Sequence, residues 1–312
     1  RDSSEMPGEV EYAFHGDFDG KGYTIRNLKL NKYGNYDHIG LFGAIRDSKV
    51  HDVKIIPDKE VKGNDRIGTV VGYAVDSEIR NVTVKNAALN TSGIAGGIAG
   101  EISGTVIENT ICDNVIIDAQ AGNEVIYIGG VAGIASDSVI ADCDVATGTG
   151  NTARIQGTGY TGGIVGFQNS TDIYNVHVNG TIGGCHSTAI GGITGNYVSG
   201  KLKVARFEGS IGNSQLGSMA REGTFIGTRQ GAATNFNYID DVAYLFADSE
   251  SKISANVCGS EIADDNDYTY AAHIGYWHSS DLHYTLVQGG TSKNMTDQYF
   301  YEELENCILT VM

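Results

Sequence analysis

An aliphatic-glycine motif recurs along most of the chain and constrains its fold more than any other feature. The final glycines of successive motifs follow one another every 28 to 33 residues. Such a near-constant period predicts one supersecondary unit that is repeated, with insertions confined to loops. The motif reads IGLFG ending at Gly43, IGTVVG at Gly72, AGGIAG at Gly100, IGGVAG at Gly133, TGGIVG at Gly166, IGGITG at Gly195 and, more weakly, GTFIG at Gly227.

A second pattern follows the glycine motifs after a short polar turn. Its first, fourth and sixth residues are mostly apolar and rich in Val and Ile, which predicts short strands rather than helix. The third residue is always Asn or Asp, and we expect it to form a turn ladder, because Asn tolerates left-handed backbone and can hydrogen-bond the next rung. The hexamers are IRNLKL from Ile25, VHDVKI from Val50, IRNVTV from Ile79, IENTIC from Ile107, IADCDV from Ile140 and IYNVHV from Ile173.

A short strand with one apolar face cannot bury itself alone. Stacking equivalent strands about 4.8 Å apart joins these apolar faces into one core. A chain of 312 residues needs either two cores or one elongated core. We therefore predict an all-β fold, a right-handed parallel β-helix of about seven coils over residues 1–231, with glycines at tight corners where coils approach closely. The rhythm fails near residue 232, and residues 232–312 are expected to form irregular final coils and a C-terminal cap of the same solenoid.

Charge and cysteine content narrow the possible partners. The formal net charge of −17 should repel phosphate backbones and anionic membranes, so we expect no nucleic-acid partner. No stretch approaches about 20 consecutive apolar residues, so we expect no membrane insertion. The five cysteines form no CxxC and have no regular spacing, and we expect buried, reduced thiols.

The run FHGDFDGKGYTIRNLKL from Phe14 to Leu30, followed by IGLFG, resembles the opening of a GLUG-repeat region. Such repeats occur in large secreted or cell-wall-attached bacterial proteins, including the N-terminal portion of the M26 metallopeptidases that cleave immunoglobulin A1. The later run KNMTDQYFYEEL resembles one that closes the repeat region there. Since the family's zinc-binding HExxH motif lies outside the repeats, the resemblance implies an accessory part without catalytic residues.

Aromatic and acidic residues gather in the C-terminal part of the chain. Rings that stack on sugar faces, beside carboxylates that accept hydroxyl protons, are typical of a sugar-binding surface, although the same rings could cap the apolar end of the solenoid. The candidate ligand-binding residues are Tyr268, Tyr270, Tyr276, Trp277, Tyr284, Asp265 and Asp267.

No metal, cofactor or catalytic site is predicted. Asp17 and Asp19 in DFDGKG resemble the start of a calcium loop, but Lys21 and Leu28 occupy positions where an EF-hand needs oxygen ligands. A polysaccharide-active enzyme would place acids and bases at one strand position in successive repeats. The solvent-facing second positions of the hexamers show no strongly recurrent pairing, and they are Arg26, His51, Arg80, Glu108, Ala141 and Tyr174.

These patterns favour a non-catalytic β-helix module of a secreted or cell-wall-attached bacterial protein. We expect it to present an elongated surface to a host glycoprotein or glycan, or to position adjacent domains of a larger chain. The alternative is a polysaccharide-active β-helix enzyme, either a lyase or a glycoside hydrolase.

Overall fold

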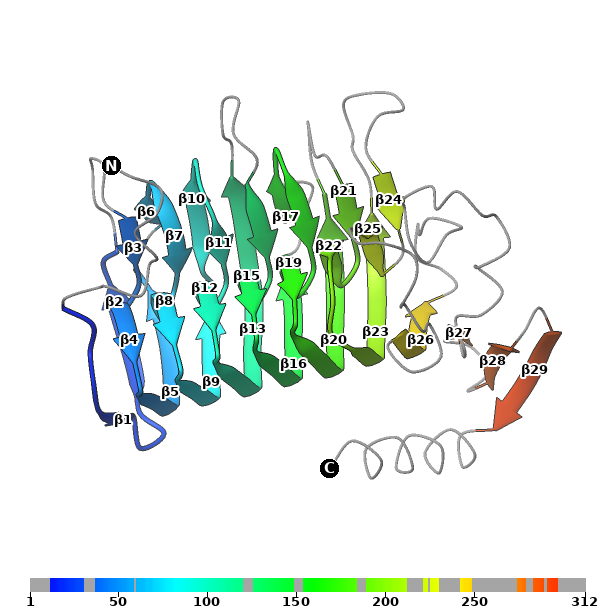
Figure 1. The fold of residues 1–312 in the computed structure, drawn as a ribbon, viewed down its shortest axis with the longest axis horizontal. Coiled ribbons are helices and arrows are strands. Elements are labelled where there is room, and N and C mark those ends of the chain that lie inside the picture. Colours follow the sequence, from blue (N-terminus) through cyan, green and yellow to red (C-terminus); the bar gives the residue numbers. More distant parts are fainter. Residues whose placement is uncertain are drawn as a thin grey trace.

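The protein is a stack of β-strand coils in a computed structural model, and Figure 1 shows the coils side by side along one axis. Three sheets run the length of the stack, one with 15 strands and two with seven strands each. This arrangement confirms the predicted all-β parallel helix. The residues that the structure describes are 12–30, 37–58, 60–119, 126–148, 154–183, 189–211, 221–223, 225–229, 242–248, 274–278, 283–288 and 291–296.

Sheet 1 is the 15-stranded sheet, and its strands are parallel up to β27. The last two strands, β28 and β29, pair antiparallel. Its strands are β1 (Asp17–Asp19), β2 (Thr24–Leu28), β5 (Lys49–Pro57), β6 (Val61–Gly63), β9 (Glu78–Lys85), β10 (Ala88–Thr91), β13 (Val106–Ala119), β16 (Val139–Thr147), β17 (Arg154–Gly157), β20 (Asp172–Ile182), β23 (Leu202–Ile211), β26 (Val242–Asp248), β27 (Ile274–His278), β28 (His283–Gln288) and β29 (Thr291–Thr296).

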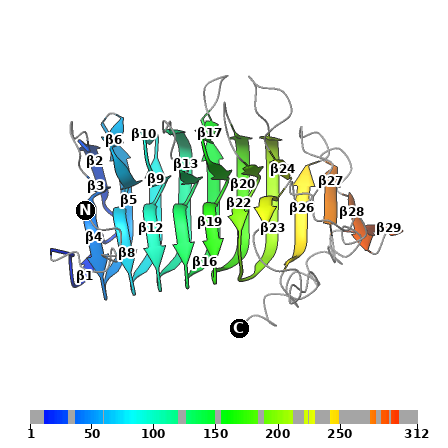
Figure 2. The same cartoon turned by 45° about the horizontal axis from the view of Figure 1, so that its top comes forward.

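Sheets 2 and 3 each take one short strand from seven successive coils. Sheet 2 contains β3 (Asp37–Ile39), β7 (Asp65–Gly68), β11 (Ala95–Gly96), β14 (Tyr127–Gly129), β18 (Tyr160–Gly162), β21 (Ala189–Gly191) and β24 (Arg221–Gly223). Sheet 3 contains β4 (Phe42–Arg46), β8 (Val71–Val75), β12 (Ala99–Ser103), β15 (Ala132–Ser136), β19 (Val165–Asn169), β22 (Thr194–Tyr197) and β25 (Ile226–Arg229). In Figure 2, only sheet 1 is seen to continue beyond these strands, through β26 to β29.

The hexamer pattern is explained by a kink at its third residue, which recurs in β5, β9, β13, β16 and β20. In β9, Ile79, Val82 and Val84 are fully buried, whereas Asn81 between them has a φ of 53°. A residue in the left-handed region breaks the strict alternation of a strand, so that positions one, four and six all face the core. Burying each of these side chains contributes roughly 1.5 to 3 kcal/mol before entropy is counted.

The predicted Asn turn ladder is present. Asn81 donates from Nδ2 to Oδ1 of Asp52 at 3.0 Å, and Asn109 donates in turn to Asn81 at 2.6 Å. Asn175 donates to Asp142 in the same way at 2.6 Å. These residues all have φ between 46° and 54°. The side-chain amides therefore tie neighbouring coils together at the position where each strand bends.

A ladder of buried hydroxyls, which the sequence analysis did not anticipate, joins sheet 3 to sheet 1. Each hydroxyl donates to the carbonyl two residues before it and accepts the backbone N–H of its counterpart in the preceding coil. Thr105, for example, donates to Ser103 O at 3.0 Å and accepts from Ser77 N at 3.3 Å. The members of the ladder are Ser48, Ser77, Thr105, Ser138 and Thr171.

The recurrent glycines stand where coils approach most closely, as predicted. A Cβ at Gly100 would lie 2.6 Å from the carbonyl oxygen of Gly72, and one at Gly133 would lie 2.7 Å from that of Gly100. Backbone contacts this short leave no room for a side chain. Each final glycine of the motif from Gly72 onward thus permits its coil to stack directly on the preceding one.

The register of the first coil differs from the one expected. Ile25 of IRNLKL pairs with Ile55 near the end of β5, whereas Phe18 of β1 pairs with Val50. The predicted equivalence of Ile25 with Val50 is therefore wrong, because the insertion after β1 shifts the later strand along its neighbour. Asp19 consequently occupies the row position that the sequence analysis gave to Arg26.

The apolar core runs continuously from Ile39 to Ile226 between the three sheets. Two of the five cysteines, Cys112 and Cys143, are buried free thiols in this core, as expected, and the other three lie outside the described residues. In the described part of the chain, no helix is long and apolar enough to cross a membrane.

Candidate functional site

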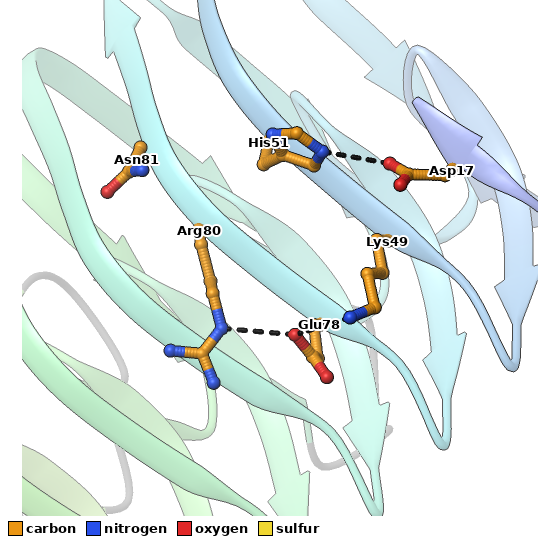
Figure 3. Close-up of a pocket in the computed structure, with 6 residues that line it drawn as sticks. All are labelled: Asp17, Lys49, His51, Glu78, Arg80 and Asn81. Atoms are coloured by element: carbon orange, nitrogen blue, oxygen red, sulfur yellow. Dashed lines mark hydrogen bonds and ion pairs between the residues drawn. The ribbon is translucent and has the colours of Figure 1, made fainter. Parts of the chain in front are cut away.

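A charged patch lies on the outer face of sheet 1 over its first strands, and we call it the β1–β9 face. One row crosses β1, β5 and β9 at Asp17, Lys49 and Glu78, and a parallel row crosses the same strands at Asp19, His51 and Arg80. All of these side chains except Asp19 line a shallow pocket of about 280 Å³ (Figure 3). The residues that line the pocket are Asp17, Lys49, His51, Glu78, Arg80 and Asn81.

His51 is the centre of this patch because both of its ring nitrogens meet carboxylates. Nε2 lies 2.8 Å from Oδ1 of Asp17 on β1, which Figure 3 marks, and Nδ1 lies 2.6 Å from Oδ2 of Asp52. The hydrogen bond to Asp52, aided by Asp17, raises the pKa of the His51 imidazole. The same hydrogen bond, with a further one from Asn81, lowers the pKa of Asp52.

The remaining charges of the β1–β9 face pair with one another. Glu78 accepts a hydrogen bond from Nε of Arg80 at 3.2 Å and lies 3.6 Å from Nζ of Lys49. Arg80 also pairs with Glu108, the next residue along its row. Such exposed pairs add little stability, typically under about 1 kcal/mol each. The face therefore offers many hydrogen-bond donors and acceptors that a polar ligand can engage at modest cost.

A second histidine cluster lies further along sheet 1. His177 on β20 has Nδ1 3.3 Å from Asp144 on β16 and Nε2 3.5 Å from Glu208 on β23. Glu208 also pairs with Arg206. Here the two carboxylates approach opposite ring nitrogens from opposite sides, so their oxygens do not converge on one nitrogen atom.

The corner between sheets 2 and 3 carries a row of cross-coil contacts. Tyr127 stacks on Tyr160 with 5.4 Å between ring centroids and an angle of 9°, and it meets the edge of Phe167 at 5.1 Å. Arg66 and Glu101 pair at 2.6 Å at the equivalent corner two coils earlier. Burial raises the pKa of Glu101, and the Arg66 guanidinium opposes that rise. The stacked tyrosines cover one face of each other, which leaves less ring surface for stacking on a sugar.

Three of the candidate residues predicted from the sequence lie on later strands of sheet 1. Tyr276 and Trp277 belong to β27 and Tyr284 belongs to β28, where backbone pairing sets Trp277 directly opposite Tyr284. Tyr268, Tyr270, Asp265 and Asp267 lie outside the described residues. Sugar binding at this cluster stays a prediction.

Part of the β1–β9 face can be aligned from the sequence, although the sequence does not single it out as a site. The hexamer alignment already placed His51, Arg80 and Glu108 in one row. It missed Lys49 and Glu78, which stand immediately before two hexamers, and it could not place Asp17, because β1 has no hexamer of its own. Reading one residue upstream of each hexamer would have revealed the pairing of Lys49 with Glu78.

The fold and this face define a parallel β-solenoid with a charged outer surface. About one third of the chain is similar to a stretch of Halomucin from Haloquadratum walsbyi, with 31% identity over 104 residues. That stretch is 33% of this chain and 1% of Halomucin, so the chain spans a very small part of that relative. No family model and no solved structure matches the chain. The resemblance to GLUG repeats and M26 metallopeptidases therefore remains a prediction.

Proposed function

We propose that this chain is a non-catalytic, extracellular surface module that presents the β1–β9 face to a host glycoprotein or glycan, and that spaces adjacent domains of a secreted or cell-wall-attached protein. The observation that carries the proposal is the pair of charged rows, which a stiff parallel sheet holds at fixed spacing across successive coils. A face of this kind resembles the polar surfaces that hydrogen-bond sugar hydroxyls and charged peptide groups.

Two further observations support this proposal. The Asn and hydroxyl ladders tie each coil to its neighbours, which suits a spacer that must keep its length. The similarity to Halomucin supports an extracellular location, because its name classes it with the mucins, which are extracellular proteins.

A binding panel tests the proposal. The purified chain is immobilised and incubated with immunoglobulin A1, mucins, and plant and microbial polysaccharides, and retention and product release are recorded in the same samples. We expect retention without release for at least one ligand. Replacing Lys49 and Arg80 together by alanine should weaken that retention at least tenfold, because it removes the two permanent cations that line the pocket.

A matched control variant replaces Lys201 and Lys203 by alanine. It removes the same two charges from the region where β23 begins, far along sheet 1 from the pocket, and it should leave retention unchanged. Equal loss in both variants would show that only overall charge matters, and it would contradict a site at the β1–β9 face.

The second candidate function is a polysaccharide-active enzyme. It is favoured by the row of Asp19, His51, Arg80 and Glu108, which places acids and bases at one strand position in successive coils, as that hypothesis requires. Release of oligosaccharide that disappears in a His51→Ala variant would establish this function instead. Release that persists in that variant would locate the activity elsewhere in the chain.

A further inference from the structure

Three potential metal ligands converge beside the pocket of the β1–β9 face. They are Oδ1 of Asp19, Nδ1 of His51 and Oδ2 of Asp52, and all lie within 4.8 Å of one another. Nδ1 is 2.6 Å from the Asp52 oxygen and 3.8 Å from the Asp19 oxygen. A metal ion bound at about 2.0 to 2.2 Å separates its ligand atoms by roughly 3 to 4 Å. Small side-chain rotations would therefore suffice to admit an ion.

A second, independent feature of this cluster is the support behind two of the three ligands, His51 and Asp52. Asp17 lies 2.8 Å from Nε2 of His51, the nitrogen that faces away from the convergence point. A carboxylate on the far nitrogen of a metal-binding imidazole is the usual supporting arrangement, because it fixes both tautomer and ring orientation. Asn81 similarly holds Oδ1 of Asp52 at 3.0 Å, which leaves Oδ2 directed at the imidazole.

The chemistry of the donor set selects the class of ion. One imidazole with two carboxylates suits borderline ions such as Zn²⁺, whereas Ca²⁺ prefers six to eight oxygen ligands. The nearby cations do not compete for these carboxylates, because Lys49 and Arg80 pair with Glu78. Water would complete the coordination sphere on the exposed side.

We propose that Asp19, His51 and Asp52 form a binding site for a divalent transition-metal ion of the Zn²⁺ class, oriented by Asp17 and Asn81. Because Asp19 belongs to β1 and the other two ligands belong to β5, the ion bridges the first strand of sheet 1 to its neighbour. The site thereby fastens the first described strand to the solenoid. This proposal is independent of ligand retention by the β1–β9 face.

Local spacing in the sequence predicts no metal site here. The EF-hand pattern fails around Asp17 and Asp19, and the imidazole comes from a strand more than 30 residues later in the chain. The stacking of β1 on β5 alone brings these groups together.

Isothermal titration of the full chain with ZnCl₂ tests the proposal. We expect one site that His51→Ala or Asp19→Asn weakens at least tenfold, and that an excess of CaCl₂ does not block. The matched control is His177→Ala, since His177 also lies between two carboxylates but on opposite nitrogens. That variant should retain the affinity.

A second measurement covers the case in which a variant is destabilised. Zn²⁺ should slow hydrogen exchange of the β1 amides in the unaltered chain and in His177→Ala, but not in His51→Gln. Absence of a Zn²⁺ site, unchanged affinity in His51→Ala, or equal loss in His177→Ala would each overturn the proposal. None of these results bears on whether the chain retains glycoproteins, which is measured without added metal.

Discussion

Replacing Thr105 by valine would remove one rung of the buried hydroxyl ladder while keeping the shape of the side chain. The Thr105 side chain is fully buried, and its hydroxyl is the acceptor for the backbone N–H of Ser77 at 3.3 Å. The carbonyl of Ser103 loses this donor but still accepts from Asp76 N at 2.9 Å. The main loss is therefore one buried N–H left without an acceptor. Such a group costs about 1 to 3 kcal/mol.

We expect Thr105→Val to lower the free energy of unfolding by that amount in urea titrations followed by circular dichroism. Because a solenoid can open coil by coil, the exchange rate of the Ser77 amide is the sharper readout, and it should rise by roughly 5- to 150-fold. Thr105→Ser keeps the hydroxyl and should protect this amide. Thr83→Val, on the half-exposed outer face, should change stability by less than about 0.5 kcal/mol. Equal loss in the Thr105 and Thr83 valine variants would refute the reasoning.

Three further predictions concern the corners and the core. Gly100→Ala should cost about 3 kcal/mol or more or prevent folding, since its Cβ would meet backbone of the preceding coil. Gly43→Ala, whose nearest described neighbour would be a backbone oxygen 3.2 Å away, should cost less in the same urea titration. Asn109→Ala should destabilise the chain more than Asn109→Gly. Both variants lose the side-chain hydrogen bond to Asn81, and alanine adds about 1 kcal/mol of strain in the left-handed backbone conformation. Equal losses of stability in the two variants would argue against strain. Burial raises the pKa of Cys143 to about 12 and that of Cys112 still higher, so at pH 8 mass spectrometry should find both thiols alkylated only after unfolding.

The period of the chain predicted the solenoid because stacking is a local rule repeated many times. Val50, Ile79 and Ile107 recur at the same hexamer position, and each pairs with the next in the sheet. The Asn ladder was predictable for the same reason. The hydroxyl ladder has an equally regular signal, a Ser or Thr two residues before each hexamer from Val50 onward, but a polar residue at a turn is equally compatible with a plain connection.

The candidate site could not be predicted in the same way, because it depends on the first coil. There the insertion between β1 and β2 breaks the period, so no alignment of repeats places Asp17 or Asp19 beside His51. Only the pairing of β1 with β5 brings these residues into contact. The aromatic cluster predicted near the C-terminus depends on residues outside the described part of the chain, and nothing in the fold tests it.

Successive coils stack in register, and every ladder and both histidine clusters depend on this stacking. The most direct test is a distance between spin labels at Lys54 and Arg206, introduced as cysteines after the native cysteines are replaced by alanine. These positions lie in one row, separated by five strand-to-strand steps through Thr83, Ile111, Asp144 and His177. At about 4.8 Å per step, pulsed electron resonance should give a narrow distribution near 24 Å plus the label linkers. A broad distribution, or one centred well beyond about 40 Å, would contradict the stacked solenoid.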